Sequence, residues 1–142
     1  MNDSPQHTNP PDHEIRRILQ TYKKVAVVGL SSNPSRTSHC VARYLQGQGF
    51  KIIPVNPKET EILGEKAYPD LNSIPEKFEI VDIFRRPEHV PAIVDQAIKA
   101  GAKVIWMQEG VVNRDAAIKA SESGLTVVMD RCMWKECRIL CE

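Results

Sequence analysis

The chain has 142 residues, the length of one domain, and 42% of them are hydrophobic, which excludes a chain that is disordered throughout. The net charge is +1, so no bulk basicity indicates a nucleic-acid partner, and four cysteines are too few for a disulfide scaffold. The N-terminal sequence lacks an apolar signal segment, and the apolar run at residues 25–30 is too short to span a membrane. We therefore expect a cytoplasmic protein with no membrane partner.

The chain begins with a segment that we expect to be a disordered tail, residues 1–12. It contains three prolines among mostly polar residues and shows no hydrophobic periodicity. A short helix follows, which Asp12 or His13 can cap and whose apolar residues share one face. These apolar residues are Ile15, Ile18, Leu19 and Tyr22.

Five short apolar runs predict strands that are buried on both faces. They occupy residues 24–30, 50–55, 79–84, 103–107 and 125–129. Helical periodicity predicts helices at residues 37–48, 87–100 and 114–123, and a short last helix from residue 132, whereas residues 58–77 show no clear helix pattern. This alternation predicts a single Rossmann-like α/β domain, residues 13–142, in which a doubly wound parallel sheet of about five strands forms a three-layer α/β/α arrangement.

Ligands of such sheets bind beyond the carboxyl ends of the strands. Polar residues concentrate after the expected strands, and we take four cations among them as candidates for contact with a ligand. The four are Arg36, Lys58, Arg85 and Arg86. Because the chain as a whole is charge-balanced, cations gathered at this edge indicate an anionic ligand, most simply a phosphorylated one.

The loop after the first strand has the residues of an anion-binding turn. Gly29 lets the backbone approach a ligand, Arg36 can hold a phosphate with two hydrogen bonds, and the next helix offers free N–H groups. Hydroxyl donors come from Ser31, Ser32, Ser35 and Ser38. The loop is neither G-x-G-x-x-G nor a Walker sequence, and the alternative is an ordinary polar turn with an N-cap serine.

The residues after the second strand distinguish among nucleotides. An NAD site favours an acidic residue at this place, whereas the chain has Asn56, Pro57 and Lys58. Lysine suits a phosphorylated ribose, as in CoA or NADP. Because the acidic Glu59 is adjacent, NAD stays an alternative ligand, although a less favoured one. The structural alternative, with no ligand at this place, is a proline turn with a solvated lysine.

Cys132 directly follows the fifth expected strand. A helix starting there, together with Arg131, would favour the thiolate and allow a mixed disulfide with a ligand thiol. The alternative is a small buried residue. The spacing of Cys137 and Cys141 relative to Cys132 matches no zinc site, so we predict no metal.

Several long segments, in order, resemble the small stand-alone CoA-binding domain proteins, which are related to the CoA-binding domain of the succinyl-CoA synthetase alpha subunit. The resemblance covers residues 24–140. It is carried by VAVVGLSSNPSRTSHCVARYL, IIPVNPKETEILGEKAYPDLNSIP, VDIFRRPEHVPAIVDQAI, GAKVIWMQEGVVN and GLTVVMDRC.

The resemblance implies coenzyme A, or an acyl-CoA, as the ligand, and it assigns roles by position. The loop around the phosphates would consist of Gly29, Ser31, Ser32, Pro34 and Arg36. The adenosine moiety would be flanked by Val55, Asn56, Pro57 and Lys58. The other side of the crevice would be closed by Phe84, Arg85 and Arg86, and the pantetheine path would be bordered by Met107, Gln108, Glu109 and Gly110.

We therefore expect a non-catalytic CoA-binding module: a carrier, a sensor or an accessory subunit with a protein partner that the sequence does not identify. The synthetase carries its phosphorylated histidine on a second domain and uses an ATP-grasp partner, so we expect that this chain alone does not run that reaction. The alternative is a small NAD(P)- or acyl-CoA-dependent enzyme that uses Cys132.

Overall fold

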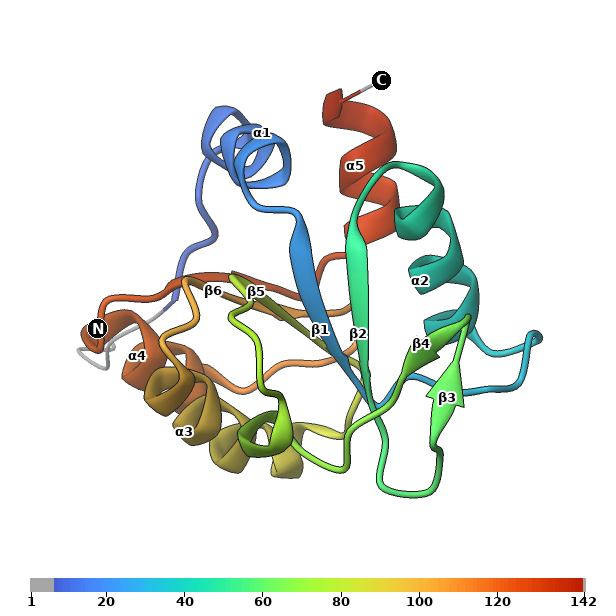
Figure 1. Ribbon diagram of the computed structural model, residues 1–142. Helices are drawn as coiled ribbons and strands as arrows, with labels where there is room; N and C mark the ends of the chain where they lie inside the picture. The colour runs from blue at the N-terminus through green and yellow to red at the C-terminus, as the bar shows by residue number, and fades with distance from the viewer. Residues whose placement is uncertain (1–6, 142) are drawn as a thin grey trace, which may run out of the picture.

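The computed structural model describes residues 7–141, and its centre is a five-stranded parallel sheet (Figure 1). The strands are β1 (Lys24–Val28), β2 (Lys51–Val55), β5 (Ile80–Ile83), β6 (Val104–Met107) and β7 (Thr126–Met129). Their order across the sheet is β2-β1-β5-β6-β7, and every neighbouring pair is parallel. The predicted Rossmann-like α/β fold is confirmed.

Helices cover both faces of the sheet (Figure 1). One layer contains α1 (Asp12–Thr21), α2 (Thr37–Gly47) and α5 (Met133–Cys141). The other contains α3 (Val90–Ala100), α4 (Arg114–Glu122) and the short 3₁₀ turn η1 (Leu71–Ser73). Among the described residues, no helix is long and apolar enough to cross a membrane.

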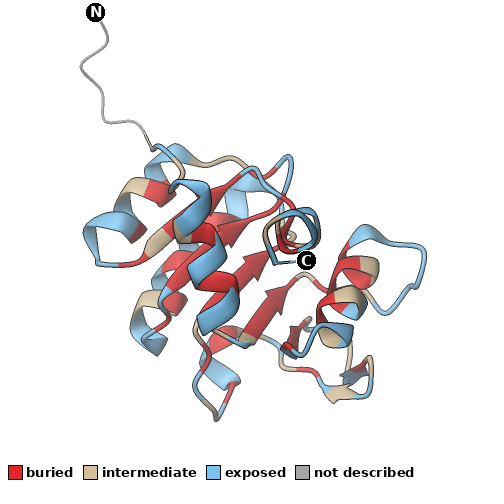
Figure 2. Ribbon diagram, turned by 90° about the horizontal axis from the view of Figure 1, so that it is seen from above, coloured by how far each residue is buried: buried red, intermediate tan, exposed pale blue. Residues whose placement is uncertain are grey.

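Alternating residues of each strand enter the two cores. In β1, Val25 and Val27 pack with α1, α2 and α5, whereas Ala26 and Val28 pack with α3 and α4. Figure 2 shows the consequence, because the strands are buried while the outer faces of the helices are exposed. A strand that is buried on both faces needs apolar residues at nearly every position, which is why continuous apolar runs predicted these strands.

Helix α3 begins after a 3₁₀ turn, η2 (Pro87–His89), and ends at Gly101 in the left-handed conformation. The side chain of Asn113 accepts a hydrogen bond from the Ala116 N–H and caps α4, as the sequence indicated. Helix α1 begins differently from the expectation. Pro11 occupies its N-cap position and Asp12 is its first residue, because the Pro11 carbonyl accepts the first hydrogen bonds of the helix, from the N–H groups of Glu14 and Ile15.

Residues 58–77 contain no α-helix. They form the hairpin of β3 (Glu61–Ile62) and β4 (Glu65–Lys66), and then η1. The hairpin turn has positive φ at both central residues, Leu63 (55°) and Gly64 (76°). Leu63 accepts this conformation in contact with the core, and its carbonyl accepts a hydrogen bond from Gln46 of α2. The segment therefore packs as an irregular link beside α2 and β2.

Part of the expected N-terminal tail has defined contacts. Asn9 is paired with the backbone of Met129 in the edge strand β7: its amide donates to the Met129 carbonyl at 2.9 Å and accepts from the Met129 N–H at 2.8 Å. The His7 ring is 2.8 Å from the same Asn9 oxygen. Residues 1–6 of that tail lie outside the described residues.

Candidate ligand groove at the carboxyl edge of the sheet

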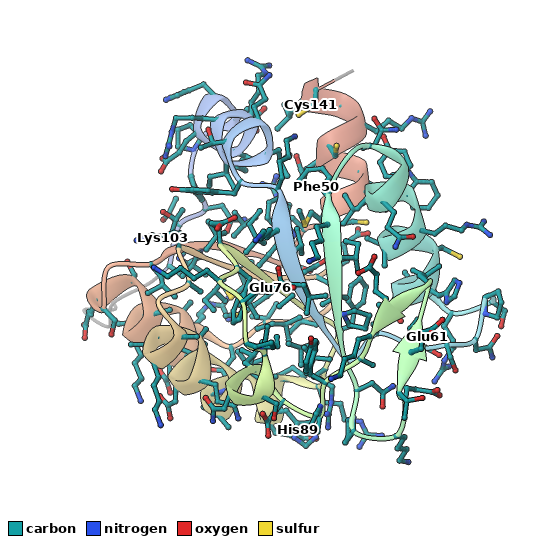
Figure 3. All side chains as sticks on the ribbon, in the orientation of Figure 1. Phe50, Glu61, Glu76, His89, Lys103 and Cys141 are labelled. Atoms are coloured by element: carbon teal, nitrogen blue, oxygen red, sulfur yellow. The ribbon has the colours of Figure 1, made fainter. Side chains whose placement is uncertain are left out.

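The chain changes direction between β1 and β5. After β1 it passes through α2 to β2 on one side, and after β5 it passes through α3 to β6 on the other side. The loops that leave these two neighbouring strands therefore diverge and open a crevice, which is the usual ligand position in such sheets. Figure 3 shows His89 toward this carboxyl end of the strands and Phe50 toward the opposite end.

Gly29 occupies the point where the two loops meet. Its φ is 87°, and a Cβ at this position would lie 2.5 Å from the carbonyl oxygen of Phe84. Both the conformation and the contact require the absence of a side chain. The sequence suggested a close approach of Gly29 to a ligand; within the chain, the close neighbour of Gly29 is the backbone of Phe84, directly after β5.

Serine and asparagine side chains hold the loop after β1 in shape. The Ser31 N–H donates to Ser38 Oγ at 3.0 Å, and Ser31 Oγ accepts from the Asn33 N–H at 3.0 Å. Ser35 Oγ donates to Asn33 Oδ1 at 2.8 Å. The ring of His39, a buried residue of α2, is 2.9 Å from the Ser31 carbonyl oxygen, so His39 has a structural contact here. The loop is therefore organised before any ligand arrives.

The N-terminus of α2 lies at the end of this loop. Arg36, and not a serine, occupies the N-cap position, and its side chain makes no capping hydrogen bond. The first N–H groups of the helix are therefore available to a ligand, together with the positive end of the helix dipole. A cavity of about 380 Å³ lies against this terminus. Its lining consists of Gly29, Ser31, Ser35, Arg36, Thr37, Ser38 and Phe84.

A second cavity, of about 190 Å³, lies at the ends of β1 and β2 and against α3. Its lining consists of Val28, Val55, Pro57, Pro69, Asp70, Leu71, Arg85, His89, Ala92, Ile93 and Gln96. Val55, Pro57 and Arg85 were candidates from the sequence, whereas most of the others were missed. The missed residues come from the irregular link and from one face of α3, and the only signal for part of them was the segment AYPDL within the family resemblance.

A third cavity, of about 430 Å³, opens between the β5 and β6 loops. Its lining consists of Thr37, Phe84, Arg85, Arg86, Pro87, Gln108, Glu109, Gly110 and Val111. It shares Thr37 and Phe84 with the first cavity and Arg85 with the second. The three cavities therefore adjoin one another around Phe84 and Arg85 and form one groove along the carboxyl edge.

Other candidate residues support the loops around the groove. Asn56 donates from Nδ2 to the Leu30 carbonyl at 3.0 Å, and its Oδ1 accepts from the Lys58 N–H at 2.9 Å. Ser32 donates from Oγ to Glu59 at 2.8 Å. Glu59, whose acidic side chain left NAD as an alternative ligand, is therefore hydrogen-bonded to the loop after β1. Pro34 accepts a weak hydrogen bond from the Cys40 thiol at its carbonyl, 3.4 Å away.

Five candidates are buried, and they are Ser38, Val55, Met107, Gln108 and Cys132. Met107 is fully buried in the core on the α3 and α4 side. Gln108 is 3% exposed, and its Oε1 accepts a hydrogen bond from the Met133 N–H at the start of α5. Cys132 is 5% exposed and packs in the core beneath α1, α2 and α5. Within residues 7–141, no group of His, Cys, Asp and Glu side chains is arranged to hold a metal ion.

The cations at this edge carry uncompensated charge. The residues that the structure describes provide no ion pair for Arg36, Lys58 or Arg85. Arg86 is 4.0 Å from Glu88 with a side chain that is 83% exposed, which is a weak contact. The groove can therefore attract a polyanion and bind it through unpaired guanidinium and ammonium groups.

One strand that leads to the groove contains a buried acid. Asp82 in β5 is fully buried, two residues before Phe84, and neither carboxyl oxygen has a hydrogen-bond partner among the described residues. Burial raises the pKa of the Asp82 carboxyl well above its usual range. Burial therefore shifts the balance at this position toward the neutral carboxylic acid and away from the carboxylate.

The chain is similar to small proteins over most of their length and to one part of larger enzymes. YneT of Bacillus subtilis is 46% identical over 125 residues, which cover 88% of this chain and 93% of YneT. The structure of a hypothetical protein from Pyrococcus horikoshii superimposes with a TM-score of 0.93 at 44% identity and covers both chains completely. The ADP-forming acetate–CoA ligase I of Archaeoglobus fulgidus is 27% identical over 121 residues, but this chain spans only 18% of that enzyme.

A family model described as a CoA binding domain matches residues 23–138, which include all five strands of the sheet and every loop of the groove. The chain therefore belongs to the CoA binding domain family.

Proposed function

We propose that the groove binds coenzyme A and that the protein acts as a non-catalytic CoA-binding module. The observation that carries the proposal is the coincidence of three adjoining cavities with unpaired cations at the switch point of the sheet. CoA has three chemically different parts, and the groove offers a matching environment for each of them.

The diphosphate belongs at the first cavity in this proposal. The free N–H groups of α2 and the guanidinium of Arg36 are the donors that a phosphate needs. The adenine belongs in the second cavity, where Val28, Val55 and Ile93 supply apolar walls and Asp70 and Gln96 supply polar groups. Lys58, which is exposed beside Pro57, is the residue for the 3′-phosphate.

The pantetheine belongs in the third cavity. Phe84, Pro87 and Val111 give this cavity apolar surface, and the backbone of residues 108–110 borders it. The volume and the position next to the first cavity suit a chain that continues from the diphosphate. The free thiol of CoA or the acyl group of an acyl-CoA would lie at the far end.

A binding module is favoured over an enzyme that uses Cys132, because this thiol is 5% exposed and packs in the core. The acetate–CoA ligases have several times the length of this chain, so their reaction is not carried over. In the cell, the module would serve as a carrier, a sensor or an accessory subunit.

Calorimetric titration of the reduced protein with CoA, dephospho-CoA, NAD and NADP in parallel tests the proposal. We expect CoA to bind most tightly and dephospho-CoA more weakly, because it lacks the 3′-phosphate. Binding of NAD or NADP without binding of CoA would overturn the proposal and favour an oxidoreductase. No binding of any of the four would also count against it.

A further inference from the structure

The segment that follows β7 holds the loop that follows β6. We call residues 130–135, which are the turn after β7 together with the start of α5, the β7–α5 connection, and residues 108–110 the β6 loop. The side chain of Asp130 accepts a hydrogen bond from the Gly110 N–H at 2.8 Å. Met133 donates its N–H to Gln108 at 3.0 Å, and Lys135 lies 2.9 Å from Glu109. Each of the three residues in the β6 loop is thus held by a different residue of the connection.

Asp130 has an unusual backbone for this task. Its φ is 61°, and among residues 7–141 the other residue besides glycine with positive φ is Leu63. Aspartate tolerates the left-handed conformation better than most residues, but glycine or asparagine would be at least as comfortable there. The next residue is anchored at both backbone groups: the Arg131 N–H donates to Met107, and the Arg131 carbonyl accepts from Trp106 Nε1 at 2.9 Å. The backbone is therefore pinned where the Asp130 carboxylate meets Gly110.

The three contacts differ in their surroundings. The Gln108 side chain is buried, so its hydrogen bond to Met133 belongs to the core. Glu109, Gly110 and Asp130 are exposed. The β6 loop is closed by a backbone hydrogen bond from the Val111 N–H to the Gln108 carbonyl at 2.9 Å, and the Asp130 carboxylate ties the outer end of this turn to the segment after β7. Lys135 contacts only the flexible side chain of Glu109. Gly110 and its neighbours line the third cavity together with Phe84 and Arg85.

We propose that Asp130 is a positioning residue. By holding Gly110, it fixes the place of the β6 loop and so keeps the third cavity at the width that the pantetheine part of CoA needs. The inference rests on the proposed function. A loop that is already held in its bound arrangement loses less conformational freedom when the ligand arrives, so binding is tighter. Only the ligand part that touches this loop gains from the restraint. The effect of Asp130 is therefore expected on CoA and not on a ligand that lacks pantetheine.

The experiment compares CoA with adenosine 3′,5′-bisphosphate, by calorimetry, on the full chain and three variants. Asp130→Gly keeps the left-handed backbone and removes the acceptor. Asp130→Asn keeps an acceptor oxygen and removes the charge. Asp130→Ala removes the acceptor and strains the backbone. We expect Asp130→Gly to weaken CoA about three- to tenfold and to change the bisphosphate affinity by less than about twofold.

Asp130→Asn is the matched control, because it removes the same negative charge as Asp130→Gly. We expect it to restore most of the CoA affinity. The inference is overturned if Asp130→Gly binds CoA like the unmodified protein, or if both ligands weaken equally, since the latter shows general damage to the domain. If the unmodified protein binds neither ligand, the proposed function fails instead.

Discussion

At the amino edge of the sheet, Lys24 and Lys51 share the carboxylate of Glu76, whereas at the carboxyl edge Arg36, Lys58 and Arg85 have no ion pair with any residue that the structure describes. Lys51 Nζ lies 2.9 Å from both Glu76 oxygens, and Lys24 Nζ lies 3.3 Å from one of them. The hydrogen bond from Lys51 lowers the pKa of Glu76.

The two edges use the same residue types for opposite purposes. The cations of the amino edge join the starts of β1 and β2 to the link before β5, and their charge is satisfied within the chain. At the carboxyl edge, Arg36 and Arg85 line the cavities and leave their charge for a ligand. The number of cations at an edge is therefore a weaker guide to a binding site than the number without an internal partner.

The largest effect is expected at Gly29, a position of the carboxyl edge that has no room for a side chain. Gly29→Ala should lower the free energy of unfolding by about 2–4 kcal/mol, because it adds a clash with Phe84 to an unfavourable φ. CoA binding should be lost with it. Urea unfolding and calorimetry measure both quantities. Gly47→Ala is the control, since a Cβ there meets no atom within 4 Å, and it should be neutral or slightly stabilising.

Arg36 tests the charge of the carboxyl edge directly. Arg36→Ala should weaken CoA binding by about 1.5–3 kcal/mol, because a charge-assisted contact to phosphate is lost, and should leave the free energy of unfolding nearly unchanged. Titration at two salt concentrations should also show a weaker salt dependence for the variant. Unchanged affinity would remove Arg36 from the site.

Asp82 tests an ionisable group of the core, in contrast to the charged groups of the two edges. Its pKa is raised by folding, so its contribution to stability is complete below the pKa of the unfolded chain and is lost as pH rises through the folded pKa. Over that interval the free energy of unfolding should fall by up to about 1.4 kcal/mol per pH unit.

Asp82→Asn should remove this fall, as urea unfolding at several pH values between acid and neutral can measure. The exposed Asp115→Asn is the control and should keep the slope of the unmodified protein. Equal slopes in the unmodified protein and in Asp82→Asn would contradict the neutral, buried form of the acid.

Lys58 tests which phosphate of CoA this part of the carboxyl edge binds. Lys58→Ala should weaken CoA about fivefold, as expected for a single exposed contact between charged groups, and dephospho-CoA less than about twofold. The ratio of the two dissociation constants is the measurement. An equal loss for both ligands would place Lys58 away from the 3′-phosphate.

The smallest effect is expected at the amino edge. Glu76→Gln should lower the free energy of unfolding by less than about 1 kcal/mol at neutral pH, because the ion pairs are partly exposed. Since the pKa of Glu76 is lowered in the fold, the difference should vanish as pH falls through that folded pKa. CoA affinity should not change. A change would show that the ion pairs of the amino edge influence binding at the carboxyl edge.

Local patterns in the chain were sufficient to predict the sheet and its helices. Apolar runs such as residues 24–30 marked the strands, and residues such as Asn113 and Gly101 marked helix ends, because burial and capping act over a few neighbouring residues. The same patterns placed Arg36 and Arg85 at one edge, since the carboxyl ends of parallel strands share an edge.

Only the tertiary structure decided which residues meet at that edge. Val55, Asp70 and Gln96 line one cavity although they lie in β2, the irregular link and α3. The side chain of Gln108 contacts α5 and the side chain of Asp130 contacts Gly110, and the two pairs are 25 and 20 positions apart in the chain. Periodicity describes a residue's own element, whereas a cavity depends on how distant elements pack, so the walls of the groove became visible only in the folded chain.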